Sequence, residues 1–359
     1  MPLTLRTIRR TLGNFAITKA NRLLGREFVP HPRKAICIET SGRCNLECRF
    51  CAYPKRGPGN FLPLDAFVSG VEQATRLGIR SIWLTPMLGD VFADPAFEEK
   101  FQYLENAPGV EQFAFFTNFI LPRPEAITRL AEYKKLAAIH ISIYGHDRAS
   151  FELVTQKPGT QHDRLLKNLM TLETTLAKRM PADGIHFSIR TLGKINSFNL
   201  PDTDLTRQLQ QLNRKFSTNL MVAEEYDNWN GTISEEDIKP LGIELSDGKN
   251  IYKSGACTLL FSGPRIASDG SVHACACRDT DGSLLIGDLS KQPLAEIISA
   301  DNATYRNIIE NQQSGRFSEN CQSCSMYRSI YDHRASTLDE NLVDVSLDAA
   351  LDLMATKNN

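Results

Sequence analysis

Cys44, Cys48 and Cys51 stand close together in the stretch 39–53, with three residues between the first pair and two between the second. Three thiols on one short loop can bind one inorganic group. A closed zinc or iron–sulfur site has four protein ligands, so three cysteines leave one metal position open for chemistry. A structural zinc loop, or a disulfide with a spare thiol, is the alternative interpretation.

A second group of cysteines lies near the end of the sequence. Cys257 is followed by twelve residues, Gly270, four residues and Cys275, and Cys321 and Cys324 come later with two residues between them. Four thiols complete a closed site. A tetrahedral zinc site remains the alternative to an iron–sulfur cluster.

Two further cysteines complete the nine in the sequence. Cys37 lies in an apolar run and is expected to be a small buried residue. Cys277 is separated from Cys275 by one residue, and it could be inert, a substitute metal ligand or a donor of a hydrogen atom.

Composition narrows the class of protein. The sequence has 359 residues, 42% of them apolar, which is enough for one large or two modest folded domains. Its 41 basic against 42 acidic residues leave a formal charge of −1, which argues against a nucleic-acid-binding surface. We find no apolar run of the roughly 20 residues that a membrane span needs and no secretion signal, and therefore expect a cytoplasmic protein whose cysteines bind metal.

Short β-branched runs alternate with longer amphipathic stretches from residue 34 onward, which is typical of repeated βα units around parallel strands. Six strands are predicted, at 34–40, 80–86, 111–117, 137–143, 185–191 and 218–224. Their covering helices are predicted at 64–77, 124–136, 162–180 and 202–216. Six units are two fewer than a full barrel has, so the predicted fold is α/β, an open six-unit partial barrel with its site at the carboxyl ends of the strands.

Other elements flank this core. An amphipathic helix over 5–25 is predicted to pack on the core, with a membrane-surface or partner-binding role as the alternative; its apolar face carries Leu5, Ile8, Leu12, Phe15, Ala16 and Leu23. Beyond about residue 235 a small Cys-rich domain is predicted, with a hairpin at 262–275 that turns at Asp269-Gly270 and a helix over 288–298. The predicted domains are an N-terminal helix (1–33), a barrel core (34–238), an auxiliary domain (239–334) and a tail (335–359).

The cysteine loop resembles the motif of the radical SAM superfamily, Cys-x3-Cys-x2-Cys with an aromatic residue, here Phe50, before the last cysteine. In that family the motif binds a four-iron, four-sulfur (4Fe-4S) cluster whose open iron chelates S-adenosylmethionine (SAM), and the core is a six-unit partial barrel. The resemblance implies that Cys44, Cys48 and Cys51 hold such a cluster together with SAM.

The C-terminal spacing resembles the Twitch subdomain, the shortened relative of the SPASM domain. This resemblance implies that Cys257, Cys275, Cys321 and Cys324 hold one auxiliary 4Fe-4S cluster. The full SPASM pattern has further cysteines that this sequence does not supply, so a second auxiliary cluster is not expected.

Further cofactor contacts are implied after the later strands. Gly89 and Asp90 resemble the family segment Gly-Gly-Glu-Pro that holds the SAM amino group, although Asp90 is shorter than Glu and an ordinary turn is the alternative. Asn118 resembles part of a Thr-Asn-Gly turn, Ser142 is a candidate partner for the ribose, and Arg190 is a candidate for the SAM carboxylate or for a surface salt bridge.

The leading functional hypothesis is a dehydrogenase-like oxidoreductase that cleaves SAM reductively to a 5′-deoxyadenosyl radical, which takes hydrogen from a small hydroxylated substrate such as a sugar or aminocyclitol. The implied electron donor is a flavodoxin or ferredoxin. Peptide modification, with Cys277 as hydrogen donor for an epimerisation, and a non-catalytic metal-binding scaffold are the alternatives. Candidates for substrate acid–base chemistry or contact are the stretch 227–231, Glu224, Glu225, Tyr226 and Arg265.

Overall fold

The computed structural model describes residues 15–84, 87–246, 248–276, 278–333 and 344–355. All six predicted strands are present and parallel. They are β2 (Ala35–Ile38), β3 (Ser81–Leu84), β4 (Gln112–Thr117), β5 (Leu136–Tyr144), β6 (Gly184–Arg190) and β7 (Asn219–Val222).

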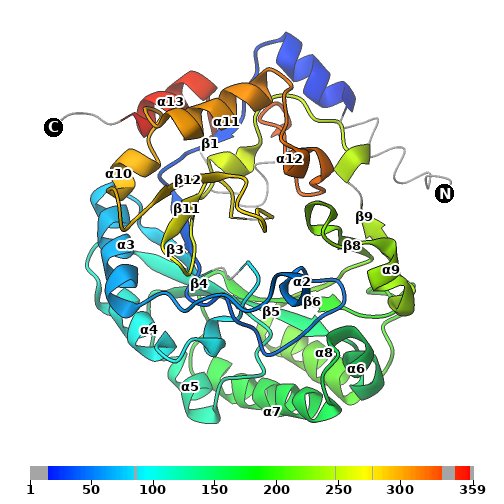
Figure 1. Cartoon of the computed structure of the whole chain (residues 1–359). Coiled ribbons are helices and arrows are strands. Elements are labelled where there is room, and N and C mark those ends of the chain that lie inside the picture. Colours follow the sequence, from blue (N-terminus) through cyan, green and yellow to red (C-terminus); the bar gives the residue numbers. More distant parts are fainter. Residues whose placement is uncertain (1–14, 85–86, 247, 277, 334–343, 356–359) are drawn as a thin grey trace.

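The sheet is open. Its order is β12-β11-β10-β2-β3-β4-β5-β6-β7, so the six barrel strands lie side by side in chain order and the two ends of the sheet are not paired with each other. The strands follow an arc, and α3, α4, α5, α7 and α8 lie along its outer side (Figure 1). The prediction of an open six-unit partial barrel is confirmed.

Side chains alternate between the two faces of this sheet. In β6, Ile185, Phe187 and Ile189 are buried in the apolar core, whereas His186 and Arg190 on the opposite face are only partly buried. Helices on the outside bury one face of each strand, and the other face lines the inside of the arc, where polar residues are tolerated. The inner face is therefore the one available to ligands.

The helices of the barrel are amphipathic, as their spacing predicts. They are α3 (Leu64–Arg76), α4 (Phe97–Asn106), α5 (Pro124–Arg129), α6 (Arg148–Thr155), α7 (Gly159–Leu176) and α8 (Asp204–Phe216). In α8 the buried face carries Leu205, Leu209 and Leu212. The predicted helix 124–136 is too long, because Leu136 already belongs to β5.

The C-terminal part joins the barrel sheet directly. Strand β10 (Arg265–Ile266) pairs antiparallel with β11 (Ser271–His273) and parallel with β2, and β11 pairs with β12 (Leu285–Asp288). The predicted turn at Asp269-Gly270 is present, with Gly270 at a φ of 85° that favours glycine. Residues more than two hundred positions apart therefore share one sheet.

Short elements complete the structure. The helices are α2 (Tyr53–Arg56), α9 (Glu235–Ile238), α10 (Leu294–Ile297), α11 (Ala303–Gln313), α12 (Glu319–Ser323) and α13 (Leu347–Met354). Strand pairs form between β1 (Val29–Pro30) and β13 (Asp344–Val345) and between β8 (Glu225–Asp227) and β9 (Glu244–Ser246). The predicted helix 288–298 begins only at Leu294, because Asp288 ends β12.

The N-terminal helix differs from its prediction. Residues 15–23 are helical, and 5–14 lie outside the described residues. Phe15 and Leu23, assigned to the buried face, are 39% and 79% exposed, and Ala16 is exposed as well. Asn21 faces the protein instead, and its Nδ2 donates to the Tyr331 carbonyl oxygen at 2.9 Å. The prediction of the packed face is wrong because polar contacts, not apolar periodicity, hold this helix.

Candidate functional site

The three loop cysteines lie together just beyond the carboxyl end of β2. Burial raises the pKa of the Cys48 thiol, and the nearby Cys51 and Cys44 thiols raise it further. Burial also raises the pKa of Cys44 to about 12, with Asp90 and Cys51 as further causes. The three thiols therefore lie near one another, and all three are free of disulfides.

The cysteine loop is held by backbone contacts with two other segments. The Glu47 N–H donates to the Thr155 carbonyl oxygen at 3.1 Å, which fixes the loop to the end of α6. The Asp90 N–H donates to the Arg43 carbonyl oxygen at 2.8 Å, which fixes it to the segment after β3. Two segments of the barrel therefore position the loop.

Gly89 allows the segment after β3 to approach the backbone of the cysteine loop closely. A β-carbon at Gly89 would lie 1.9 Å from the Ser41 carbonyl oxygen, so only glycine lets the two backbones meet. This contact explains why a glycine stands in the motif after β3.

Asp90 has a different environment from the one expected of a ligand contact. Its carboxylate accepts from the Asn118 N–H at 2.6 Å, the Phe92 N–H at 2.9 Å and the Thr117 hydroxyl, and the residue is 1% exposed. Burial raises the pKa of Asp90 to about 6, against the effect of these hydrogen bonds. Asp90 therefore ties the ends of β3 and β4 together, and its contact with the SAM amino group stays a prediction.

The other predicted cofactor residues gather around the loop. Asn118 Nδ2 lies 3.7 Å from Cys44 Sγ, and Arg190 Nη1 lies 3.4 Å from Ser142 Oγ on the inner face of the sheet. The ring of Phe50 is 7% exposed and lies 6.0 Å from the Arg190 guanidinium. Residues from four separate segments meet at one mouth of the barrel.

The four C-terminal cysteines also meet. Cys257, Cys275, Cys321 and Cys324 line one cavity, together with Gln312, Arg278 and others. Within the described part of the chain, no three His, Cys, Asp or Glu side chains converge as the ligands of a single metal ion would. Cysteines of an iron–sulfur cluster bind different iron atoms, so they need to surround a cavity and not a point. The cavity lined by the four cysteines has the donor set that such a cluster requires.

Arg278 influences both groups of thiols. It lines the C-terminal cavity, and its positive charge lowers the pKa of Cys51, which burial otherwise raises. Its Nε donates to Asp227 Oδ1 at 2.6 Å, and its guanidinium lies 4.3 Å from the ring of Trp229. Asn230 Nδ2 donates to its carbonyl oxygen at 2.6 Å. The guanidinium is therefore held in one place.

The stretch 227–231 supplies these contacts from a strained backbone. Trp229 and Asn230 have φ values of 47° and 56°, in the left-handed region that non-glycine residues rarely occupy. Trp229 is 9% exposed and packs under Arg278. Trp229 can therefore pack between the barrel and the auxiliary domain and also lie close to the site.

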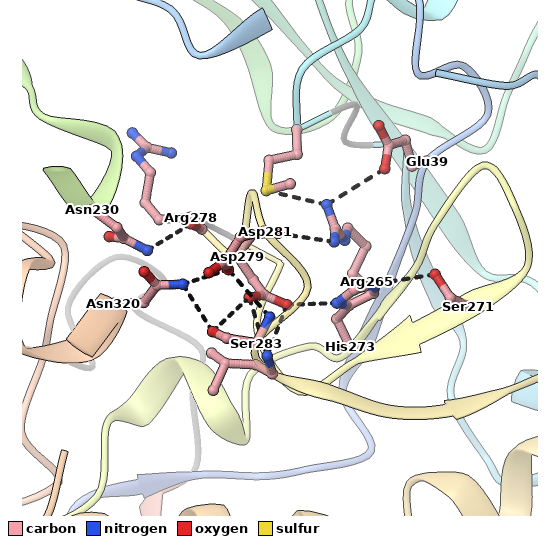
Figure 2. Close-up of polar contacts among 12 residues, drawn as sticks. Glu39, Asn230, Arg265, Ser271, His273, Arg278, Asp279, Asp281, Ser283 and Asn320 are labelled. Atoms are coloured by element: carbon pink, nitrogen blue, oxygen red, sulfur yellow. Dashed lines mark hydrogen bonds and ion pairs between the residues drawn. The ribbon is translucent and has the colours of Figure 1, made fainter. Parts of the chain in front are cut away.

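A buried polar network joins the hairpin to the end of β2. Figure 2 shows Arg265 between Glu39 and Asp279, and its Nη1 lies 3.4 Å from Glu39 Oε2 and 3.1 Å from Met87 Sδ. Asp279 Oδ2 also lies 2.5 Å from His273 Nδ1. Arg265 is 1% exposed, so it couples the two domains and is not open to a ligand in this structure.

Sequence reasoning did not identify Gln312, and the structure places most of the remaining candidates. Gln312 touches two of the cavity segments, but a single glutamine in a helix gives no signal in a sequence. Tyr226, a candidate for acid–base chemistry, is buried, and its hydroxyl donates to the Thr191 carbonyl oxygen at 2.8 Å. Glu224 and Glu225 are exposed. Cys277, the predicted hydrogen donor, lies outside the described residues.

Among the described helices, we find none that is long and apolar enough to cross a membrane.

Comparisons with known proteins agree with this arrangement. The radical SAM superfamily matches residues 38–175, and the iron–sulfur cluster-binding domain SPASM matches residues 257–325. A GTP 3′,8-cyclase from a Synechococcus species is 31% identical over 122 residues, which are 33% of this chain and 34% of that protein. The chain therefore matches only about a third of the length of this curated relative.

Solved structures share the fold at low sequence identity. BtrN in complex with AdoMet and 2-DOIA is 13% identical, with a TM-score of 0.50 over 81% of this chain and 92% of that one. Streptococcus suis SuiB bound to precursor peptide SuiA is 13% identical, with a TM-score of 0.52 over 90% of this chain and 77% of that one. The structure of anSMEcpe with bound AdoMet and a peptide is 14% identical, with a TM-score of 0.52 over 89% of this chain and 95% of that one.

A radical SAM domain implies a 4Fe-4S cluster and SAM, and an SPASM domain implies an auxiliary iron–sulfur cluster. The two gathered sets of thiols, both free of disulfides, have the donor chemistry that these groups require. The chain therefore carries a domain that matches the radical SAM superfamily, at residues 38–175, followed by an SPASM-type iron–sulfur domain at residues 257–325.

Proposed function

We propose that this enzyme oxidises a small hydroxylated substrate, of the sugar or aminocyclitol type, by two electrons in total. When bound, the first cluster and SAM supply a 5′-deoxyadenosyl radical that removes hydrogen from carbon, and the auxiliary cluster supplies an acceptor for the remaining electron. The four-cysteine cavity is the site proposed for that auxiliary cluster.

The position of Arg278 is the observation that carries the proposal. The Arg278 side chain lines the four-cysteine cavity, and its positive charge also lowers the pKa of Cys51 in the other group. A substrate in the barrel mouth would therefore lie near both groups of thiols. A substrate in this position could lose a hydrogen atom on the side of the first cluster and SAM, and an electron on the side of the auxiliary cluster.

Residues of this chain would hold and orient the reactants. Cys44, Cys48 and Cys51 hold the first cluster, while Arg190 offers a planar pair of donors to the SAM carboxylate. Ser142 offers a hydroxyl to the ribose. Phe50 and the surrounding apolar side chains keep water away from the reacting atoms.

The hydroxylated substrate class is supported by the inner face of the barrel and by one structural relative. Ser188 pairs in register with Ser142, and its hydroxyl is buried without a partner among the described residues. The structure of BtrN, which this chain matches over 92% of that protein, contains AdoMet and 2-DOIA. We further propose a cytoplasmic location and a flavodoxin or ferredoxin as reductant.

Peptide modification is the second candidate. The structures of SuiB and anSMEcpe, which match 90% and 89% of this chain, contain peptides. In that case Cys277 would be the hydrogen donor of an epimerisation. Replacing Cys277 with alanine would then stop product formation while 5′-deoxyadenosine is still made.

The test begins with SAM cleavage. The protein is loaded anaerobically with iron and sulfide, reduced and mixed with SAM, and 5′-deoxyadenosine is measured by chromatography. We expect its formation by the wild type and its loss in Cys51→Ala. No cleavage by fully loaded, reduced protein would contradict radical SAM activity in this chain.

Substrate class is then tested with deuterium. Polyols and aminocyclitols deuterated at carbon are compared with deuterated peptides, and transfer of the label to 5′-deoxyadenosine is measured by mass spectrometry. Transfer from the first group with a carbonyl product supports the proposal, and transfer only from peptides supports the second candidate. Cys257→Ala should keep SAM cleavage but lose the carbonyl product.

A further inference from the structure

Gln312 is a buried side chain on the wall of the four-cysteine cavity. It lies near the end of α11 and is 3% exposed. Its amide group lies between two cavity segments that are far apart in the sequence, one with Cys257 and the other with Cys321. Any group held by these cysteines has Gln312 as a direct neighbour of its ligands.

The orientation of the Gln312 amide is fixed by its partners. Gln312 Oε1 accepts from the backbone N–H of Cys257 at 2.8 Å. A backbone N–H can only donate, so the oxygen must face Cys257 and the NH₂ group must face the other way. Nε2 then lies 3.3 Å from Cys321 Sγ and donates to it.

A hydrogen-bond donor at a cysteine sulfur changes the reduction potential of a cluster bound there. Reduction adds negative charge to the cluster and its thiolates, and an N–H that points at a sulfur stabilises that charge. Hydrogen bonds to the sulfurs are among the factors that set iron–sulfur reduction potentials, and burial strengthens them. Removing such a donor therefore makes the cluster harder to reduce.

Gln312 donates through its side chain, so a substitution can remove this donor. Cys257 Sγ accepts from the backbone N–H of Arg328 at 3.4 Å, which no substitution other than proline can remove. Gln313 comes next in the helix, but its Oε1 lies 3.3 Å from the Tyr331 hydroxyl. Gln313 therefore provides a matched control with the same side chain one residue along.

We propose that Gln312 is a positioning residue that raises the reduction potential of the auxiliary cluster through its hydrogen bond to the Cys321 sulfur. The same amide holds the Cys257 and Cys321 segments at a set separation. The consequence for electron uptake from substrate rests on the proposed function. The effect on the potential does not, because it is measured without substrate.

The test is a redox titration of the full chain loaded with both clusters, followed by electron paramagnetic resonance. A background with Cys44, Cys48 and Cys51 replaced by alanine identifies the auxiliary signal. Gln312→Leu removes the donor without adding charge, and Gln313→Leu is the control. At the wild-type midpoint, we expect Gln312→Leu to lower the ratio of reduced to oxidised auxiliary cluster about tenfold, a shift of about 59 mV for one electron.

The control should keep the wild-type midpoint. A fully loaded Gln312→Leu with the wild-type midpoint, or an equal shift in Gln313→Leu, overturns the proposal. If Gln312→Leu takes up less iron, Gln312→Met, which is also neutral and has no N–H donor, is titrated against Gln313→Met. A lower midpoint for Gln312→Met than for Gln313→Met supports the proposal, and equal midpoints reject it.

Discussion

Lys100→Met should destabilise the barrel strongly, because Lys100 and Asp94 form a fully buried ion pair. Lys100 Nζ lies 2.5 Å from Asp94 Oδ2, and the two side chains are 0% and 1% exposed. Lys100 Nζ also donates to the Leu62 carbonyl oxygen. Methionine fills a similar volume, but it leaves the Asp94 carboxylate buried without its counter-charge.

The expected cost follows from this burial. Removing one partner of a buried ion pair costs about 3–5 kcal/mol. For 359 residues, an unfolding entropy of about 2.1 cal/mol/K per residue gives a fall of about 1.3 °C in the melting temperature for each kcal/mol. We therefore expect a fall of about 4–7 °C, measured by calorimetry on loaded protein.

Two further variants test the reasoning. Lys291→Met removes an exposed lysine, 76% exposed and 2.8 Å from Asp288, and should leave the melting temperature unchanged. Asp94→Asn combined with Lys100→Met removes both charges and should recover much of the loss, since Asn can still accept from the Ala96 N–H through its side-chain oxygen. A wild-type melting temperature for Lys100→Met alone would refute the argument.

Other predictions concern the loop, pH and iron. Gly89→Ala should reduce iron at the first cluster, measured by metal analysis, because the new methyl group would collide with the Ser41 carbonyl oxygen. Burial, with a smaller effect of His186, lowers the pKa of His140 to about 3 from 6.5. The unfolded chain therefore binds a proton between these values that the folded chain does not, and stability should fall by about 1.4 kcal/mol per pH unit as pH drops below 6.5. Urea unfolding at pH 7, 6 and 5 should show this slope in the wild type and a smaller one in His140→Phe. Iron analysis should give about eight atoms per chain in the wild type and about four in Cys257→Ala; about four in the wild type would contradict the auxiliary cluster.

Several features could be predicted from the sequence because they depend on local patterns. The six strands follow from the alternation of apolar runs with amphipathic stretches, and the turn at Asp269-Gly270 follows from the conformational needs of a hairpin. The cysteine spacing indicates which thiols act together. The residues that make up each signal lie close together in the chain, so the signal can be recognised in the sequence alone.

The sequence misled where packing or polar contacts override a pattern. Periodicity placed Leu23 on a buried face, but hydrogen bonds from Asn21 and Arg22 turn the helix so that Leu23 is exposed. The hydrogen bonds that the Asp90 carboxylate accepts from the Asn118 and Phe92 N–H groups were also not evident from the sequence, and its contact with the SAM amino group stays a prediction. Neither set of contacts leaves a trace in local composition.

The sequence by itself determined the two sets of thiols and the barrel that presents the first set, because local spacing and periodicity encode both. Only the tertiary structure decided how the two sets relate. The parallel pairing of β10 with β2 joins the hairpin to the barrel sheet, and Arg278 lies near enough to Cys51 to lower its pKa. Gln312 separately bridges Cys257 and Cys321. Most of these contacts join residues separated by long stretches of chain, and the free energy of packing the whole molecule, not any local preference, selects them.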